Sequence, residues 1–340
     1  MINSNFILIL FVITNLIFFL NFSKIKIFHL NIDKPDKKRK FHSQPTPLAG
    51  GILIFINLIL YWFICIIQND FVDYEIFFQN QNSLNYFIGI STIIFILGFI
   101  DDKVNLKANL KFIILLIAIL LLLLLDKSLI IDKINFSFFS GTFILDGFSI
   151  FFSVFCFLVF INAFNMFDGI NLQSGLYSIL IFFCILIFYS NSFLVKIMII
   201  SLICFSYLNF KNKTFLGDSG SLLISFIISY LFIKLYNLDY IKYAENITLY
   251  MMIPGLDLIR LFVLRTINKK NPLTSDRNHL HHILIKKYSF EKTLIIIFLL
   301  ISLPLIMNNF NVNNLFTIFV TIFIYCFVIL FSSKKTNISP

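Results

Sequence analysis

The amino-acid sequence contains few charged residues. Asp, Glu, Lys and Arg make up 13% of its 340 residues, whereas 59% are hydrophobic and the mean hydropathy is +0.92. About a quarter of a soluble globular domain is charged, so this composition excludes that class and indicates an integral membrane protein. We expect residues 1–340 to form one domain, because a helical bundle of this size in lipid is a single folding unit.

The sequence also lacks the features of a secreted, disulfide-bonded protein. Its five cysteines are odd in number, lie inside apolar stretches and form no CxxC pair. This pattern is typical of small hydrophobic side chains, and it predicts neither disulfides nor a thiolate metal site. The first apolar stretch, residues 5–22, has no basic segment before it and no small-residue cleavage site after it, so we expect a retained first helix.

Long apolar stretches make up most of the chain. A run of about 17–25 apolar residues crosses a bilayer as a helix, because a helix satisfies its own backbone hydrogen bonds in lipid. The stretches predict an all-α polytopic bundle of about eleven transmembrane helices. Their approximate centres are Ile13, Asn57, Thr92, Ile117, Phe155, Ile181, Ile200, Ile228, Ile259, Leu299 and Ile322.

The loops between these stretches differ in their content of basic residues. Alternate loops on one side, together with the C-terminal tail, carry 22 of the 27 Lys and Arg residues, and the other side carries five. Because basic loops remain in the cytoplasm, this asymmetry predicts an N-terminus outside and a cytoplasmic C-terminus. Topology therefore explains the net charge of +10.

Carboxylates gather at the ends of apolar stretches on the basic side. Asp101 and Asp102 end the third stretch in LGFIDDKVNLKANLK. A solvated helix end would explain such a pair, but the negative end of a helix dipole disfavours anions. A divalent cation would compensate for this placement, and oxygen ligands of this kind suit Mg²⁺.

A second polar motif, NAFNMFDGINLQSG, ends the fifth stretch. Asn162, Asn165 and Asp168 recur at every third residue and therefore share one side of a helix. Polar side chains that enter a bilayer are costly unless they face a polar cavity. A helix-terminal cap would be a simpler explanation. We expect Gly169 to end the helix and let a ligand approach the backbone.

A third motif, FLGDSGSLL, begins the eighth stretch. Asp218 and Ser219 stand at a helix N-terminus, where backbone N–H groups suit an anion or a capping acid. A plain N-cap would explain them. The flanking Gly217 and Gly220 add access to the backbone, which a cap alone does not require.

Two further motifs lie near the ninth stretch. In PGLDLIR, Asp257 and Arg260 have the i, i+3 spacing of an ion pair that supports the bundle. The following segment, NPLTSDRNHLHHIL, contains three of the five histidines. Zinc would need a further close ligand, so we expect phosphate or uracil binding instead. The residues concerned are Arg277, His279, His281 and His282.

The first basic loop, DKPDKKRKFHSQPTPLAGG, joins a basic run to a segment rich in Pro and Gly. Such runs usually set topology or bind lipid. The Pro/Gly end predicts a rigid loop that re-enters the membrane. The basic residues are Lys34, Lys37, Lys38, Arg39 and Lys40.

These motifs occur in one order over about residues 35–285: RKFH…PTPLAGGI, DD, NxxNxxDG, GDSGS, PxxDxxR and HLHH. In this order, with eleven stretches, the chain resembles the polyprenyl-phosphate N-acetylhexosamine-1-phosphate transferases, the MraY/WecA/TagO superfamily. The HLHH segment is similar to the WecA/TagO branch.

The resemblance implies transfer of N-acetylhexosamine 1-phosphate, or a related sugar 1-phosphate, from a UDP-sugar to undecaprenyl phosphate with release of UMP. It implies Mg²⁺, or alternatively Mn²⁺, and the cytoplasmic face of a bacterial inner membrane. The reaction would be the first membrane step of a cell-envelope polysaccharide. No nucleic-acid partner is implied, and a homodimer is left open.

The resemblance also implies roles for the motif residues. Asp218 would be the principal metal ligand, with Asp101, Asn162 and Asn165 also in the metal shell. Asp101, Asp102 and Asp168 are the catalytic candidates, and direct attack by the lipid phosphate and covalent attack by an aspartate both remain open. The substrate-binding candidates are Lys34, Lys111, Asn165, Asn171, Arg277, His279, His281 and His282.

One position departs from the family pattern. Where the family has DGxDGL, this chain has DGINLQ, with Asn171 for the second acid and Leu172 for the glycine. An amide cannot act as a base, so an altered sugar preference or reduced activity is left open. Three different functions also stay open: a phospho-MurNAc-pentapeptide transferase, a proton-coupled transporter that uses Asp and His, and a non-catalytic member that binds lipid.

Overall fold

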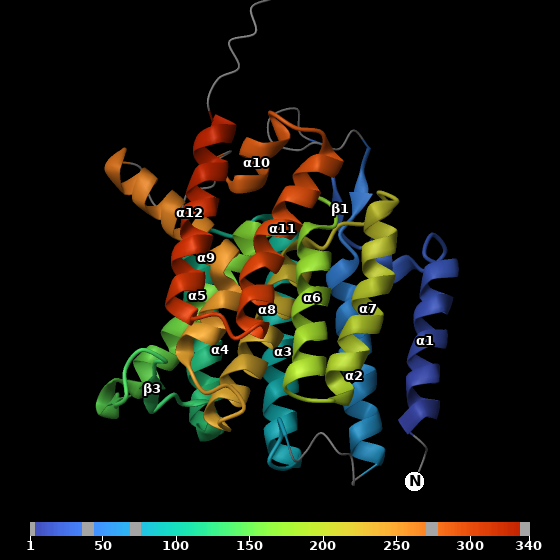
Figure 1. Ribbon diagram of the computed structural model, residues 1–340. Coiled ribbons are helices and arrows are strands. Elements are labelled where there is room, and N and C mark those ends of the chain that lie inside the picture. Colours follow the sequence, from blue (N-terminus) through green and yellow to red (C-terminus); the bar gives the residue numbers. More distant parts are fainter. Residues whose placement is uncertain (1–3, 36–43, 69–75, 270–277, 334–340) are drawn as a thin grey trace, which may run out of the picture.

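The computed structural model describes residues 4–35, 44–68, 76–269 and 278–333. These residues form a bundle in which most helices run side by side along one direction (Figure 1). The helices are α1 Ser4–Leu20, α2 Gly50–Ile67, α3 Gln81–Val104, α4 Ala108–Leu125, α5 Ser149–Phe167, α6 Gln173–Phe188, α7 Phe193–Phe210, α8 Gly217–Asn237, α9 Ala244–Ile267, α10 Leu280–Ile285, α11 Phe290–Asn309 and α12 Asn314–Ser333.

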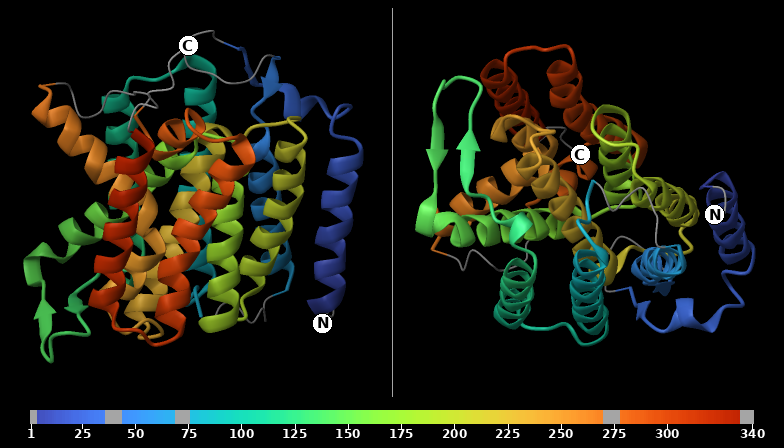
Figure 2. Two further views of the ribbon diagram at one scale, coloured as in Figure 1. Left: turned by 45° about the horizontal axis from the view of Figure 1, so that its top comes forward. Right: turned by 90° about the horizontal axis from the view of Figure 1, so that it is seen from below.

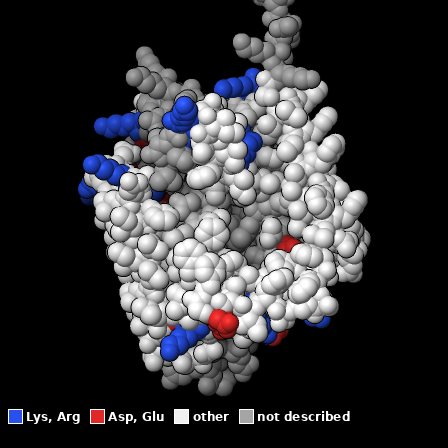
Figure 3. Space-filling model, turned by 90° about the vertical axis from the view of Figure 1, so that its left-hand side faces the viewer, with Lys and Arg blue, Asp and Glu red and all other residues white. Residues whose placement is uncertain are grey.

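The predicted all-α polytopic architecture is confirmed. The centre of each of the eleven expected stretches lies within a long helix, and the short α10 is an additional helix. Within the described ranges, nine helices are long and apolar enough to cross a membrane, and α1 and α6 are shorter apolar helices. On the face shown in Figure 3, Lys and Arg gather near the top, a few charged residues lie at the bottom, and most of the middle is uncharged.

Among the described residues, two short antiparallel strand pairs lie outside the bundle, and the sequence patterns did not predict them. β1 Ile32–Asp33 pairs with β2 Thr46–Pro47, and β3 Lys133–Asn135 pairs with β4 Thr142–Ile144. Within the part of the chain that the structure describes, the connections also contain three 3₁₀ turns, η1 Lys26–His29, η3 Lys127–Leu129 and η4 Asp146–Phe148. Seen from below, the β3–β4 hairpin projects beyond the outline of the bundle (Figure 2).

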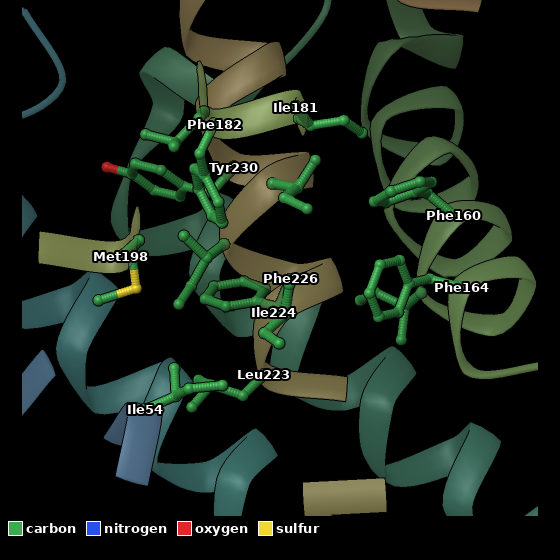
Figure 4. Packing of buried hydrophobic residues seen from close by; sticks show 14 of the residues in the cluster. Ile54, Phe160, Phe164, Ile181, Phe182, Met198, Leu223, Ile224, Phe226 and Tyr230 are labelled. Carbon is green, nitrogen blue, oxygen red and sulfur yellow. The ribbon is translucent and has the colours of Figure 1, made fainter. Parts of the chain in front are cut away.

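Helix α8 is the central element. All residues of its apolar stretch are buried, whereas 22% of the residues in the apolar stretch of α12 are buried. Figure 4 shows how Leu223, Ile224, Phe226 and Tyr230 of α8 pack among side chains of α2, α5, α6 and α7. Ser221, Ser225 and Ser229 add small side chains along α8, and small residues let neighbouring helices approach closely in a membrane bundle.

Glycines bring two neighbours against the start of α8. A Cβ at Gly98 of α3 would lie 2.5 Å from the Asp218 carbonyl oxygen, and one at Gly51 of α2 would lie 2.5 Å from the Gly220 nitrogen. Real Cβ atoms do not come this close to backbone, so both positions require glycine. The ends of α2 and α3 are therefore held against the residues that begin α8.

The Pro/Gly-rich end of the first basic loop is held by the segment that precedes α8. The Phe215 N–H donates to the Pro47 carbonyl (2.9 Å), and the N–H groups of Gly50 and Gly51 donate to the carbonyls of Phe215 (3.0 Å) and Leu216 (3.1 Å). This pairing gives the loop end a defined position. Its predicted re-entry into the membrane stays a prediction.

At the opposite end of the bundle, one basic residue is buried. The count of basic loops assigns Lys234 to the weakly basic side, but it lies inside α8 with a side chain 3% exposed. Its ammonium group contacts the buried Asp126 carboxylate at 2.9 Å and also the Ser128 hydroxyl. A buried charge needs such a partner, so the Lys234–Asp126 pair is part of the core.

The close approach of α3 to α8 can be tested with two glycines of α3. Gly98→Ala should lower the free energy of unfolding by about 1–3 kcal/mol, because its methyl group would overlap the α8 backbone. The matched control is Gly89→Ala, since a Cβ at Gly89 meets nothing within 4 Å. Thermal unfolding of both variants in detergent checks this, and equal midpoints would contradict the packing described.

Candidate active site

A cavity of about 770 Å³ lies where α3, α5 and α7 end and where α6 and α8 begin. Several polar and aromatic groups from these ends share it. Among the described residues that line it, five are aspartates and none is Lys or Arg. The aspartates are Asp33, Asp101, Asp102, Asp168 and Asp218, and the aromatic residues are Phe205, Phe210, Phe215, Phe290 and His282.

Asp101 and Asp218 meet at one ammonium group. The Lys111 Nζ lies 2.5 Å from Asp101 Oδ2 and 3.0 Å from Asp218 Oδ2. The ends of α3 and α8 and the first turn of α4 are thereby joined. Two carboxylates that are far apart in the sequence thus converge at one point on the cavity wall, as the metal hypothesis requires.

Asp102 has a different position from its neighbour and caps α8. Its carboxylate accepts hydrogen bonds from the Asp218 N–H (2.7 Å), the Ser219 N–H (3.1 Å) and the Ser219 hydroxyl (2.7 Å). Gly217 has φ +74°, and a Cβ there would lie 2.7 Å from Asp102 Oδ2. The backbone access that Gly217 provides is therefore used by Asp102, which holds Asp218 in place.

Both carboxylates at the end of α3 have protein partners. The sequence alone suggests that two carboxylates at a negative helix end need a divalent cation. In the structure Lys111 pairs with Asp101, whose Oδ1 also accepts the Leu106 N–H at 2.7 Å. Asp102 meets the positive end of the α8 dipole. Protein groups already compensate both charges, so the charge at this helix end does not by itself require a metal.

Asp168 caps the end of α5 and faces the same cavity. The Ser174 hydroxyl donates a hydrogen bond to its Oδ1. Burial raises the pKa of Asp168 to about 6, the negative charge of Asp102 adds to this shift, and the Ser174 hydrogen bond opposes it. A carboxyl group with a pKa in this range exchanges protons readily near neutral pH, which is typical of catalytic acids and bases.

The structure does not bring the two predicted asparagine ligands to the cavity. Asn162 donates to the Leu158 carbonyl of its own helix at 2.7 Å. Asn165 accepts a hydrogen bond from the Ser221 hydroxyl of α8 at 2.5 Å. Neither lines the cavity. Both residues lie on α5, as the three-residue repeat predicts. Asn162 bonds within α5, and Asn165 joins α5 to α8.

The histidine segment is held by one buried carboxylate. Asp257 Oδ2 lies 3.1 Å from His279 Nδ1, and its Oδ1 accepts the Leu280 N–H at 3.1 Å. The same Oδ1 contacts Arg260 (2.7 Å) and the Tyr325 hydroxyl (2.8 Å). The predicted Asp257–Arg260 ion pair is confirmed. Its further role, which the spacing did not reveal, is to fasten the start of α10 to α9 and α12.

The three histidines occupy different environments. His282 lines the cavity, whereas His281 is 2% exposed and its ring lies against the backbone of Gly169. Burial lowers the pKa of His281 well below its usual value, and the neighbouring His282 and His279 add to this shift. The sequence predicts that the space beside Gly169 admits a ligand. In the structure the His281 ring occupies the side of Gly169 where a Cβ would lie, and Gly169 also lines the cavity.

Some predicted residues lie elsewhere, and some cavity residues were not predicted. Arg277 is outside the described residues. Lys34 follows β1 but does not line the cavity, whereas its neighbour Asp33 does. Four polar residues of the cavity were given no role from the motifs. Asn105 and Asn212 lie in the connections after α3 and α7, and Ser174 and Asn209 lie in the first turn of α6 and the last turn of α7.

The chain is similar in sequence to known proteins. Residues 84–236 match the family model described as glycosyl transferase family 4. The chain is 28% identical over 305 residues to an undecaprenyl-phosphate alpha-N-acetylglucosaminyl 1-phosphate transferase of Thermotoga maritima. The aligned residues cover 88% of each of the two chains. It is 25% identical over 267 residues to the protein of that name from Escherichia coli (strain K12), covering 75% of this chain and 69% of the relative.

The matched residues 84–236 include the ends of α3 and α5 and the start of α8, which carry Asp101, Asp102, Asp168 and Asp218. The family match therefore covers four of the five aspartates that line the cavity. These findings confirm the resemblance that the motif order predicts: the chain is similar to undecaprenyl-phosphate alpha-N-acetylglucosaminyl 1-phosphate transferases.

Proposed function

We propose that this protein transfers N-acetylglucosamine 1-phosphate, or a closely related sugar 1-phosphate, from a UDP-sugar to undecaprenyl phosphate and releases UMP. The observation that carries the proposal is the convergence of Asp101, Asp168 and Asp218 from three helix ends on one cavity. The names of the similar proteins supply the substrates. The basic loops support a cytoplasmic location for this end of the bundle, in a bacterial inner membrane.

A divalent cation fits the donor chemistry of the cavity. Five carboxylates line a site that would receive two phosphorylated substrates, and so much negative charge needs positive charge beside it. In the described residues no group of three His, Cys, Asp or Glu is arranged to hold a metal. Mg²⁺ does not need one, because it often binds through one or two carboxylates together with substrate phosphates and water.

Asp218 and Asp101 are the residues that would hold the ion, since their oxygens already converge on the Lys111 ammonium group. Bound Mg²⁺ would offset the negative charge of the phosphates. Lys111 supplies a further positive charge at the same point. Asp102 acts through the α8 backbone as a positioning residue. Asp168, with its raised pKa, is suited to exchange a proton with the lipid phosphate.

The cavity wall also suits a nucleotide-sugar. Phe205, Phe210 and Phe215 provide aromatic surface, and His282 provides an imidazole ring from a distant part of the sequence. Aromatic faces stack on bases at about 1–3 kcal/mol each in nucleic-acid complexes. A proton-coupled transporter would need Asp257 as its proton carrier, but this carboxylate is held by Arg260, Tyr325 and His279.

The carboxylate assignment can be tested by UMP release from UDP-N-acetylglucosamine and undecaprenyl phosphate with Mg²⁺. Asp101→Asn and Asp218→Asn should each reduce the rate by on the order of 10²–10³, because each removes a charge that the reaction needs. Asp239→Asn is the matched control, since this aspartate is exposed and pairs with Lys133 at 3.8 Å. Full activity of either cavity variant would contradict the assignment.

The histidine positions predict separate effects. His282→Ala should raise the KM for the UDP-sugar about tenfold, since its ring lines the cavity. His281→Ala should instead lower the unfolding midpoint, because its buried ring packs on Gly169. His29→Ala is the control, since this residue lies on η1 and does not line the cavity. Steady-state kinetics and thermal unfolding separate the two effects, and an unchanged KM in His282→Ala would count against nucleotide binding there.

A further inference from the structure

The turn at residues 168–172, which departs from the family pattern, adopts a strained backbone. Leu172 has φ +67° and ψ −19°, in the left-handed region that favours glycine. This chain holds that conformation with a leucine side chain, which resists it. The conformation is held from both sides: the Leu172 N–H donates to Asn209 Oδ1 (2.6 Å), and its carbonyl accepts the Leu176 N–H (2.9 Å).

The orientation of the Asn209 amide is determined by backbone groups. Its Oδ1 accepts from the Leu172 N–H, which can only donate. Its Nδ2 donates to the Thr214 carbonyl at 2.7 Å, which can only accept. The two ends of this buried side chain are therefore assigned without ambiguity. Asn209 joins the turn after α5 to the segment that leads into α8.

Asn171 forms a reciprocal pair with Asn209. Its Nδ2 donates to the Asn209 carbonyl at 3.1 Å, and its Oδ1 accepts from Asn209 Nδ2 at 3.3 Å. The same Nδ2 donates to Asn212 Oδ1 at 2.6 Å. A backbone carbonyl cannot donate, so the atom that faces it from residue 171 must carry a hydrogen. An amide meets this requirement, and an ionised carboxylate does not.

We propose that Asn171 and Asn209 are a positioning pair that holds the 168–172 turn, and with it Asp168, at the wall of the cavity. On this view Asn171 is not an impaired catalytic acid. A carboxylate at this position would direct an oxygen at the Asn209 carbonyl and would add a sixth negative charge to a cavity lined by five aspartates. The amide is therefore the residue that this strained version of the turn requires.

The link to catalysis rests on the proposed function, whereas the pairing itself can be measured without it. The test compares Asn171→Asp, Asn171→Ala and wild type in thermal unfolding and in UMP release. At about pH 8 both variants should have lower unfolding midpoints and about tenfold lower rates, because each loses the donor to the Asn209 carbonyl. Asn209→Ala should behave in the same way, since it leaves the Leu172 N–H without its acceptor.

Lowering the pH distinguishes a positioning pair from a general loss of packing. A protonated carboxyl group has nearly the shape of an amide and supplies one O–H donor and one carbonyl acceptor, although it lacks the second N–H that Asn171 donates to Asn212. Asn171→Asp should therefore recover part of the way toward wild type as the pH falls to about 5.5. The folded state favours the protonated form, so the pKa of the introduced group is raised. The stability that the introduced carboxyl group contributes is present at low pH and is lost as the pH rises through that pKa.

Asn171→Ala should show no such recovery relative to wild type. Asn21→Asp is the matched control, because Asn21 lies in the turn that follows α1, does not line the cavity, and also donates to a backbone carbonyl, that of Ile17, at 3.1 Å. A large gain of activity in Asn171→Asp at pH 8, or identical pH dependence of the Asp and Ala variants, would overturn the proposal. If wild type releases no UMP, the proposed function fails, and the unfolding midpoints still decide the pairing.

Discussion

Asp102 accepts hydrogen bonds from the backbone at the start of α8, and this contact joins the end of α3 to the most buried helix of the bundle. The contact depends on Gly217, whose positive φ and missing side chain leave room for the carboxylate. Gly98 and Gly51 bring α3 and α2 against the same residues. Because the first turn of α8 carries Asp218, the packing of glycines there determines where the carboxylates of the cavity meet.

A membrane bundle has good physical reason to build a polar site in this way. Apolar side chains gain nothing by leaving lipid for one another, so association depends on close packing of small residues and on hydrogen bonds between helices. The polar groups of the cavity lie at helix ends, where the backbone itself offers donors and acceptors. Asp102, Asp168 and Asp257 each bond to groups of a neighbouring segment, so that the site and the bundle share the same contacts.

Several motif residues have partners that their spacing in the sequence did not reveal. Asn162 and Asn165 share a helix face as predicted, but they meet Leu158 and Ser221 inside the bundle. Asp257 pairs with Arg260 as its spacing predicts, and it also holds the histidine segment. Spacing along a helix predicts which side chains point the same way. Spacing does not predict which other helix lies opposite these side chains. In this protein the opposite helix determines what each side chain does.

The sequence by itself determined the class of the molecule, since long apolar stretches in lipid form helices, and alternate basic loops predict which ends share a side. It also determined which residues have the chemistry for a phosphate-transfer site. Only the tertiary structure decided that Lys111 lies between Asp101 and Asp218, that His282 and not His281 reaches the cavity, and that Asn171 pairs with Asn209. These contacts join distant segments, so they depend on how the helices pack and not on any local pattern.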